Sequence, residues 1–192
     1  RPPRSTLFPY TTLFRSGYRG LIPKYQHNPI LLTPEVVDSI HEQGGTILGS
    51  SRGHQSIEEM TETIIRMNIN LLFCVGGDGT LRGAKAIGDE ALKKGQSISV
   101  IGVPKTIDND LSFIEKSFGF ETSVYTACQI ISSAHWEAKG AFNGVALIKV
   151  MGRDSGFIAA ASTLANPVVD FCLVPESEFS LEGEHEIGRA HV

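Results

Sequence analysis

The chain has 192 residues, of which 41% are hydrophobic and 20% charged, and its formal net charge is -4. These totals suit one globular domain or part of a larger one. They argue against a general nucleic-acid or membrane-surface binder, because such surfaces need clustered Lys and Arg. No apolar run reaches the length of a membrane span, and no charged-then-apolar segment marks secretion. We therefore expect a soluble intracellular protein, in which any anionic substrate is held by local groups.

The two ends of the chain differ from its interior. Residues 1–16 (RPPRSTLFPYTTLFRS) show neither a helical nor an alternating apolar period, and they resemble a translated sequencing adapter. Residues 186–192 (EIGRAHV) resemble a second such scar. We expect a non-native leader and tail around a partial domain at residues 17–185.

Two elements are predicted in the first quarter of that interior. Thr33 suits a helix N-cap, Pro34 suits the first helical position, and Gly44-Gly45 suits the end of the helix. The β-branched residues at 46–49 predict a strand directly afterwards. Alternating strands and helices are typical of a parallel sheet covered by helices.

The next helix has the clearest start signal in the chain. Ser56 and Glu59 have the spacing of a capping box, in which each side chain bonds a backbone N–H of the other residue. Helical spacing places the apolar side chains of the following turns on one face, which should cover the sheet. These side chains belong to Ile57, Met60, Ile64 and Met67.

Three apolar strands are each followed by a polar turn. The strands are predicted at residues 71–75, 98–103 and 145–150, and the turns read GGDGT, PKTIDND and MGR. A long helix is predicted at residues 121–139, and a fourth strand at residues 171–174. We predict an incomplete α/β, doubly wound (Rossmann-like) fold with a mostly parallel sheet and helices on both faces. The carboxyl ends of its strands would bring the turns into one crevice.

The three cysteines carry no metal or redox pattern. Cys74, Cys128 and Cys172 are far apart, in apolar surroundings, and lack the paired spacing of a zinc site or a redox motif. Buried reduced thiols are the expectation.

The GGDGT turn favours phosphate binding. Its glycines let backbone N–H groups approach phosphate oxygens, and Asp78 supplies a hard oxygen ligand for Mg²⁺. The alternative is a glycine-rich strand-to-helix turn in which Asp78 is only a helix cap. The motif alone leaves both open.

The PKTIDND turn contains groups for phosphorylating an alcohol. Asp108 and Asp110 lie on the same side of an extended segment, with Lys105 and a hydroxyl just upstream. A carboxylate accepts the hydroxyl proton, and a cation offsets charge on the moving phosphoryl group; Asp108 and Lys105 suit these roles. The alternative is an Asx-rich turn, because Asp and Asn bond their own backbone.

The motifs GGDGT, PKTIDND and MGRDSG follow one another along the chain, and GGTILGSSRG lies upstream of them. In these motifs and in their order, the chain resembles the phosphofructokinases over nearly all of residues 17–183. The resemblance implies a glycolytic kinase that transfers the γ-phosphate of ATP to the 1-hydroxyl of fructose 6-phosphate. In that family the GGDG aspartate binds the Mg²⁺ that bridges the nucleotide phosphates. That role falls on Asp78, with Asp110 near the metal. The implied nucleotide contacts are Arg52, Gly53, Gly77, Asp78, Gly79, Thr80 and Gly83.

The resemblance also assigns the sugar site. Asp108 becomes the proton acceptor, with Lys105 and Thr106 as further catalytic residues. The implied substrate contacts are Thr106, Ile107, Asp108, Met151, Gly152, Arg153 and Glu176. Taken singly, three of these have plainer alternatives: Met151 as core, Arg153 as a helix cap and Glu176 as a solvated turn residue.

The phosphate donor follows from two positions. Gly79 replaces the second aspartate usual in the pyrophosphate-dependent branch, which leaves room for the nucleotide α-phosphate. Lys105 resembles the pyrophosphate branch. The mixture is similar to plant and protist ATP-dependent enzymes, so we choose ATP, with the pyrophosphate-dependent enzyme as the alternative. A lipid or NAD kinase would share GGDGT but does not account for PKTIDND followed by MGR.

Some family features are missing from this chain. The GGxxPG loop and the second domain with its basic residues are absent, and Gly144 stands where bacterial relatives carry an arginine that crosses a subunit boundary. We therefore expect the chain to be inactive alone, as a nucleotide-binding remnant prone to aggregation. The full-length parent is expected to be a cytoplasmic homo-oligomer, a tetramer, with a plastid location as the alternative.

Overall fold

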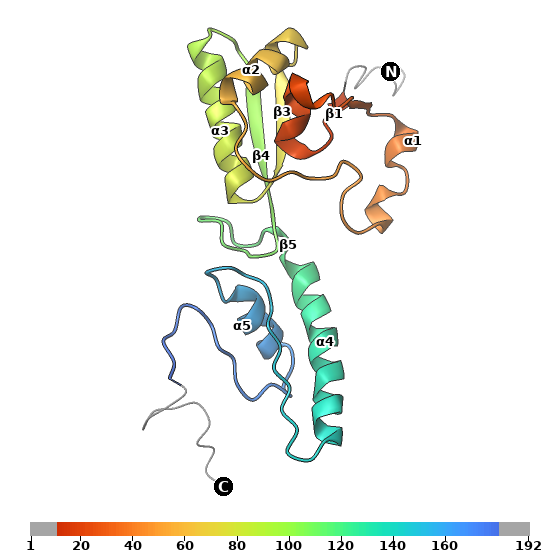
Figure 1. The fold of residues 1–192 in the computed structure, drawn as a ribbon, viewed down its shortest axis with the longest axis vertical. Coiled ribbons are helices and arrows are strands. Elements are labelled where there is room, and N and C mark those ends of the chain that lie inside the picture. The colour runs from red at the N-terminus through yellow and green to blue at the C-terminus, as the bar shows by residue number, and fades with distance from the viewer. Residues whose placement is uncertain (1–10, 181–192) are drawn as a thin grey trace. The chain divides into compact units, whose positions relative to one another are not determined.

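The computed structural model describes residues 11–180, which belong to two compact units. The first unit comprises the chain up to Cys74 together with Arg82–Ile101, and the second comprises Val75–Leu81 together with the chain from Gly102 onward. The tail at residues 186–192 lies outside the described residues, as does the leader up to residue 10. The elements in chain order (Figure 1) are β1 (Thr12–Leu13), η2 (Gly17–Leu21), η3 (Pro23–Tyr25), β2 (Ile30–Leu31), α1 (Pro34–Val37), η4 (Ile40–Glu42), α2 (Ile57–Arg66), β3 (Leu71–Gly76), α3 (Asp78–Lys93), β4 (Ser99–Thr106), β5 (Phe118–Gly119), α4 (Phe120–Gly140) and α5 (Phe157–Leu164).

The first unit begins with a short antiparallel ladder. Thr12 pairs with Leu31 and Leu13 with Ile30, so β1 and β2 form a two-stranded sheet. The Ser16 N–H donates to the Leu48 carbonyl at 2.7 Å. Residues of the expected non-native leader thus take part in local structure, and their non-native origin stays a prediction.

The helix expected from Thr33 to the Gly44-Gly45 pair is wrong. The structure has only α1, of four residues, and the 3-10 turn η4, and neither contains a buried residue. Isolated helical turns are unstable unless an apolar face packs, which explains the interruption. The strand expected at residues 46–49 is also wrong, because a turn closes there: the Gly49 N–H reaches the Thr46 carbonyl.

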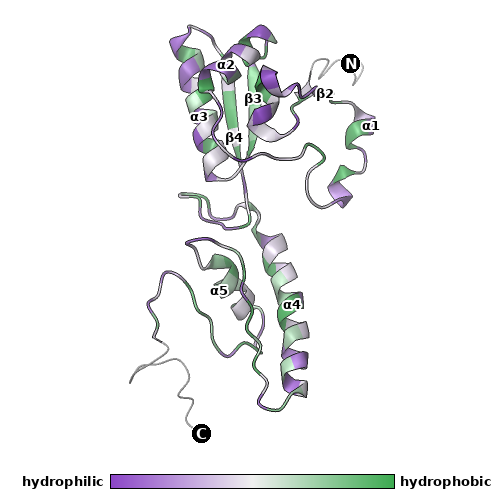
Figure 2. Ribbon diagram, in the orientation of Figure 1, coloured by the Kyte–Doolittle hydropathy of each residue, from purple (hydrophilic) through white to green (hydrophobic). Residues whose placement is uncertain are grey.

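The α2 helix confirms its start signal. The hydroxyl of Ser56 accepts a hydrogen bond from the Glu59 N–H at 3.2 Å, and the helix begins at Ile57. Met60 and Ile64 are 1% and 0% exposed, and Ile57 packs against the same cluster, so the predicted apolar face packs up to Ile64. Met67, the C-cap of the helix, is 39% exposed and does not belong to it. Figure 2 shows this division between polar and apolar sides on α2 and α3.

The core of the first unit lies on one face of β3. Leu72 and Cys74 are buried in a cluster with side chains from η2, α2 and α3. On the other face of the strand, Leu71 is 46% and Phe73 58% exposed. The α/β class is confirmed, but the expected burial of this strand on both faces is wrong for the described residues.

The second unit contains the end of β4 and its partner β5. Lys105 pairs with Phe118 and Thr106 with Gly119 in a parallel ladder, and the three-stranded sheet has the order β3-β4-β5. The long helix predicted at residues 121–139 is confirmed as α4. Helix α4 packs against α5 through a cluster that includes Phe120, Ala127 and Ile158.

Two predicted strands of the second unit are wrong, because residues 145–150 and 171–174 form no ladder. Val145 is 91% and Leu147 90% exposed. An extended segment becomes a strand only when a neighbour pairs with its N–H and C=O groups, and the described residues supply none there. The sheet is accordingly incomplete.

The cysteines are free thiols with different exposure. Cys74 is buried, Cys128 is intermediate and Cys172 is exposed, so the expectation of burial is confirmed for the first and wrong for the last. Burial raises the pKa of the Cys74 thiol, an effect that the neighbouring Tyr18 hydroxyl partly offsets. Burial also raises the pKa of Tyr18, and Cys74 adds to that shift.

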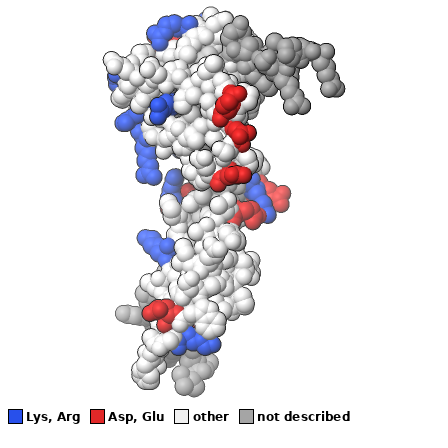
Figure 3. Space-filling model, turned by 90° about the vertical axis from the view of Figure 1, so that its right-hand side faces the viewer, with Lys and Arg blue, Asp and Glu red and all other residues white. Residues whose placement is uncertain are grey.

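Within residues 11–180, no helix combines the length and apolar character needed to cross a bilayer. The face drawn in Figure 3 carries both acidic and basic side chains. Ion pairs join Lys85 to Asp89 at 2.6 Å and Lys94 to Glu62 at 3.1 Å. These are exposed pairs, which contribute little to stability.

Candidate functional site

The GGDGT turn joins β3 to α3 in the second unit. The N–H groups of Thr80 and Leu81 both donate to the Gly77 carbonyl, at 2.9 and 3.0 Å, which closes the first turn of the helix. A Cβ at Gly76 would lie 2.3 Å from the Thr80 Oγ1, so the turn requires glycine there. A Cβ at Gly79 would meet nothing within 4 Å. The helix N-terminus therefore borders open space, where backbone N–H groups favour an anion.

The GGDGT turn lies against the end of β4. A Cβ built on Gly77 would be 3.5 Å from the Cβ of Thr106 and 3.9 Å from the carbonyl oxygen of Lys105. A side chain at this position would thus be in ordinary van der Waals contact with β4, so the backbone beside Asp78 lies next to the start of the TIDND turn. The first two predicted turns are thus neighbours.

A hydrogen-bond network holds the TIDND turn. The Asp108 N–H donates to the Thr106 Oγ1 at 3.2 Å, and the Asn109 backbone is left-handed, with φ of 54°. The Asn109 Oδ1 accepts from the N–H of Ser117 at 2.7 Å, and its Nδ2 donates to the Glu115 carbonyl at 3.1 Å. The Ser117 hydroxyl, on a residue only 4% exposed, donates to the Thr106 carbonyl at 2.7 Å.

This network bears on the plainer interpretation of the DND segment. The amide side chain of Asn109 bonds the backbone of Glu115 and Ser117, six and eight residues away, whereas an Asx turn uses the backbone two residues on. The bonds to Asp108 use its backbone atoms, which leaves its carboxylate out of the network. Asp108 is half-buried and Asp110 exposed.

The MGRDSG turn contacts the TIDND turn directly. The hydroxyl of Ser155 lies 3.0 Å from the Asp108 carbonyl oxygen and 2.9 Å from that of Gly152. The Ser155 N–H also donates to the Gly152 carbonyl at 2.9 Å. Arg153 is exposed and left-handed, with φ of 55°, a conformation that costs a non-glycine residue free energy and often occurs at functional sites.

Glu176 lies next to the same turn. Its Oε1 accepts a hydrogen bond from the Gly156 N–H at 2.7 Å, and Gly156 is the N-cap of α5. A carboxylate at a helix N-terminus is favourable because of the helix dipole. Glu176 is an exposed turn residue, as its plainer alternative expects, and its carboxylate also bonds the segment that follows Arg153.

The second unit thus brings most of the predicted site residues into neighbouring turns. Two of the plainer alternatives are wrong: Met151 is 69% exposed and so is not core, and the cap of α5 is Gly156, not Arg153. The predicted site residues of this unit are Gly77, Asp78, Gly79, Thr80, Lys105, Thr106, Ile107, Asp108, Asp110, Met151, Gly152, Arg153 and Glu176.

Three predicted nucleotide contacts belong to the first unit, so the geometry above does not include them. They are Arg52, Gly53 and Gly83. Gly53 is left-handed, with φ of +93°, which favours glycine on backbone grounds. A Cβ at Gly83 would lie 2.6 Å from the ring of Tyr18, so close packing also accounts for that glycine.

The carboxylates form no dense metal cage. Among residues 11–180, no group of three or more His, Cys, Asp or Glu side chains is placed to hold a metal ion. Mg²⁺ is commonly bound through one or two carboxylates together with substrate phosphates and water. Half-buried Asp78 and exposed Asp110 fit that kind of site in donor chemistry.

Sequence reasoning missed three residues of the site. Asn109, Ser117 and Ser155 make the bonds that position the turns. Asn109 and Ser155 lie inside the motifs, where small polar residues are a signal for turns. Ser117 lies outside them, and no local pattern identified it.

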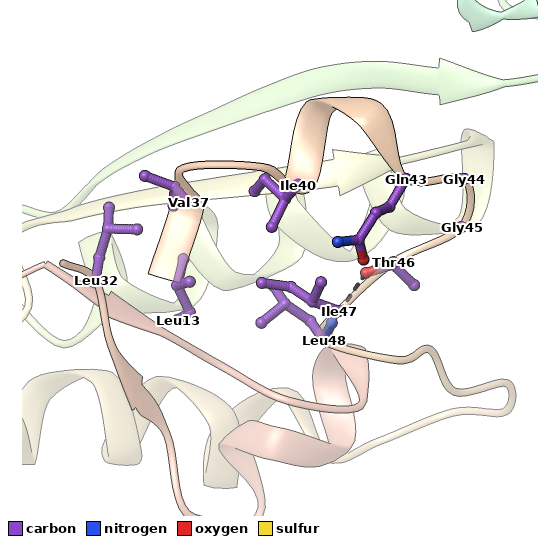
Figure 4. Close-up of a pocket in the computed structure, with 10 residues that line it drawn as sticks. All are labelled: Leu13, Leu32, Val37, Ile40, Gln43, Gly44, Gly45, Thr46, Ile47 and Leu48. Carbon is purple, nitrogen blue, oxygen red and sulfur yellow. Dashed lines mark hydrogen bonds between the residues drawn. The ribbon is translucent and has the colours of Figure 1, made fainter. Parts of the chain in front are cut away.

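A separate cavity of about 250 Å³ occurs in the first unit (Figure 4). It contains no predicted site residue, and most of its side chains are aliphatic. Its lining residues are Leu13, Leu32, Val37, Ile40, Gln43, Gly44, Gly45, Thr46, Ile47 and Leu48.

The protein-family model described as Phosphofructokinase matches residues 10–189 of this chain. An ATP-dependent 6-phosphofructokinase from Borreliella burgdorferi is 53% identical over 167 residues, which is 87% of this chain and 37% of the relative. ATP-dependent 6-phosphofructokinase 7 from Arabidopsis thaliana is 48% identical over 168 residues, 88% of this chain and 34% of the relative. The chain therefore spans little more than a third of these relatives.

Solved structures similar to this chain are also phosphofructokinases. Phosphofructokinase from Saccharomyces cerevisiae matches with a TM-score of 0.68 and 25% identity, over 85% of this chain and 24% of that one. A pyrophosphate-dependent phosphofructokinase from Marinobacter aquaeolei matches with a TM-score of 0.66 and 25% identity, over 84% of this chain and 43% of that one. The fold is that of these enzymes in part.

Proposed function

Because this chain belongs to the phosphofructokinase family, we propose that it is a segment of an ATP-dependent 6-phosphofructokinase. The reaction is transfer of the ATP γ-phosphate to the 1-hydroxyl of fructose 6-phosphate, which gives fructose 1,6-bisphosphate. The observation that carries this proposal is the arrangement of the three turns in the second unit: Gly77 lies beside Thr106, and the Asp108 carbonyl is bonded to Ser155. This arrangement supports one phosphoryl-transfer site built from the three turns.

Asp108 is the proposed proton acceptor. Its backbone N–H is bound by Thr106 and its carbonyl by Ser155, so the carboxylate projects from a fixed point. Fixed placement of a base supports proton transfer from the sugar hydroxyl as the phosphoryl group arrives. Exposed Lys105, the residue before Thr106 on β4, is assigned to offset charge on that group.

The sugar phosphate is assigned to the MGR turn and Glu176. Exposed Met151 and Arg153 are available to a ligand, and a guanidinium can bind two phosphate or hydroxyl oxygens at once. Glu176 holds the Gly156 N–H with one carboxylate oxygen. Its other oxygen is assigned to the sugar, together with the backbone at Gly152.

The nucleotide is assigned to the N-terminus of α3, with Gly77, Gly79 and Thr80 as its lining. The open space at Gly79 supports room for an α-phosphate. Mg²⁺, held by Asp78 and Asp110 together with the phosphates, would neutralise charge on the transferring group. The contacts predicted at Arg52, Gly53 and Gly83 lie in the first unit and stay predictions from the sequence.

The pyrophosphate-dependent enzyme is the second candidate. Lys105 favours it, and solved structures similar to this chain include pyrophosphate-dependent phosphofructokinases. ATP is preferred because relatives at 45% to 54% identity are named ATP-dependent 6-phosphofructokinases. For the full-length protein we propose a homo-oligomer in the cytoplasm; one relative from Arabidopsis thaliana is named chloroplastic.

The test uses the full-length enzyme that contains this segment. Asp108→Asn should lower the turnover number with Mg·ATP at least about 100-fold, because it removes the base, while the nucleotide dissociation constant stays within about twofold. Normal turnover in Asp108→Asn would refute the base assignment. A higher kcat/KM with pyrophosphate than with ATP in the wild type would refute the donor.

The isolated 192-residue chain has a separate expectation. It should lack phosphotransfer activity, because the family's second domain contributes to the sugar site. Calorimetric titration with Mg·ATP measures whether the chain retains nucleotide binding. Turnover of fructose 6-phosphate by this chain alone would contradict the proposal that it is an incomplete remnant.

A further inference from the structure

We propose that Ser155 is a positioning residue for phosphoryl transfer, which holds the backbone of Asp108 against the sugar-binding turn. The inference rests on the proposed function and deepens it. In this inference, a hydroxyl that touches neither substrate couples the position of the base to the sugar site.

The Ser155 hydroxyl bridges two turns that are distant in the chain. Its single proton lies between the Asp108 carbonyl oxygen, at 3.0 Å, and the Gly152 carbonyl oxygen, at 2.9 Å. The bond to Asp108 spans 47 residues of sequence. Gly152 directly precedes Arg153, so one hydroxyl fixes the distance between the base turn and the residue assigned to the sugar phosphate.

Ser155 itself has a firm anchor. Its N–H donates to the Gly152 carbonyl, and the next N–H, that of Gly156, is bound by the Glu176 carboxylate. Helix α5 begins immediately afterwards, and its Ile158 is 2% exposed in the cluster with α4. The hydroxyl therefore projects from a packed helix start and not from a free loop.

Asp108 is held from both sides of its backbone. Thr106 Oγ1 binds its N–H, and Ser155 Oγ binds its carbonyl. Without the second bond, the MGRDSG turn no longer opposes a tilt of the peptide unit after Asp108, which changes ψ of Asp108 and φ of Asn109. A displacement of about 1 Å at a catalytic group lowers rates by about 100-fold, so loss of this bond should be visible in kcat.

The test compares Ser155 variants of the full-length enzyme. Ser155→Ala should lower kcat for fructose 6-phosphate about 10- to 100-fold, with the ATP dissociation constant within about twofold of wild type. Ser155→Thr keeps the hydroxyl and should retain kcat within about threefold. Ser155→Cys, whose thiol is a weak donor, should fall between them.

Ser162→Ala is the matched control. The Ser162 hydroxyl is buried on α5 but donates to the Ile158 carbonyl of its own helix, so its removal should leave kcat unchanged. Circular dichroism of each variant checks folding. If Ser155→Ala does not fold, the kcat values of the wild type, Ser155→Thr and Ser155→Cys still test the inference, because the Cys variant should be slower than the other two. Equal kcat values in all three would overturn it.

A double-mutant cycle with Asp108→Asn identifies the route of the effect. If Ser155 acts through Asp108, Ser155→Ala should cost less than about twofold in kcat once Asp108 is replaced. An undiminished loss in that background would overturn the positioning role. A wild-type enzyme that transfers no phosphate to fructose 6-phosphate would instead refute the proposed function, and this inference with it.

Discussion

Replacement of Asn109 by alanine tests the network that holds the base turn. The substitution removes the Oδ1 that accepts from the Ser117 N–H at 2.7 Å and the Nδ2 that donates to the Glu115 carbonyl. Ser117 is 4% exposed, so water cannot readily replace the lost acceptor. An unsatisfied buried donor costs about 1 to 3 kcal/mol.

The backbone adds a second cost. Asn109 has a φ of 54°, and the left-handed conformation is about 1 kcal/mol less favourable for alanine. Together the two effects lower the free energy of local opening by about 2 to 4 kcal/mol. Since about 1.4 kcal/mol corresponds to tenfold, amide exchange in this segment should accelerate roughly 30- to 700-fold.

Hydrogen exchange with mass spectrometry on peptides covering residues 105–119 measures this opening. Glycine adopts a positive φ without strain, so Asn109→Gly should show only the part of the acceleration that comes from the lost side-chain hydrogen bonds. Asn68→Ala is a matched control, because Asn68 is also left-handed, with φ of 55°, but lies at the end of α2. Unchanged exchange in Asn109→Ala would refute the positioning network.

Three further predictions concern the nucleotide turn and the first core. Gly76→Ala should weaken Mg·ATP binding by the full-length enzyme at least about tenfold in a calorimetric titration, because its Cβ would lie 2.3 Å from Thr80 Oγ1; unaltered binding would contradict this. Gly79→Asp should fold normally and lower kcat/KM for ATP at least about tenfold relative to pyrophosphate, because a carboxylate would occupy the space assigned to the α-phosphate; an unchanged donor ratio would count against that assignment. The pKa values of Cys74 and Tyr18 are raised above their ordinary values of 9.0 and 10.0, so above these pH values the folded chain keeps protons that the unfolded chain has lost. The free energy of unfolding should therefore fall as the pH rises through this range. Thermal melts between pH 7 and 11 check this, and Tyr18→Phe should flatten the alkaline decline.

The parts of the fold that could be predicted from sequence are those with local signals. Helix α2 follows from Ser56 and Glu59, whose hydrogen bond the structure contains. The proximity of the GGDGT and TIDND turns follows from their places after the apolar strands β3 and β4, and Gly77 lies beside Thr106. The MGRDSG turn joins them through the bond of Ser155 to Asp108, although the strand expected before it does not form.

Other elements depend on partners that a local pattern does not specify. Residues 145–150 have strand composition but no neighbour to complete a ladder among the described residues. The helix expected after Thr33 breaks because α1 and η4 bury no side chain. Ser117 was not found because its role depends on a bond to Thr106, 11 residues away.

Phosphorus NMR of the reaction products tests the central claim most directly. The full-length enzyme is mixed with Mg·ATP and fructose 6-phosphate, and the position of the new phosphate ester is read from its coupling to the sugar protons. A new ester on carbon 1, formed with loss of the ATP γ-phosphate and absent from Asp108→Asn, is the predicted result. An unchanged sugar spectrum, or an ester formed only when pyrophosphate is the donor, would contradict the account.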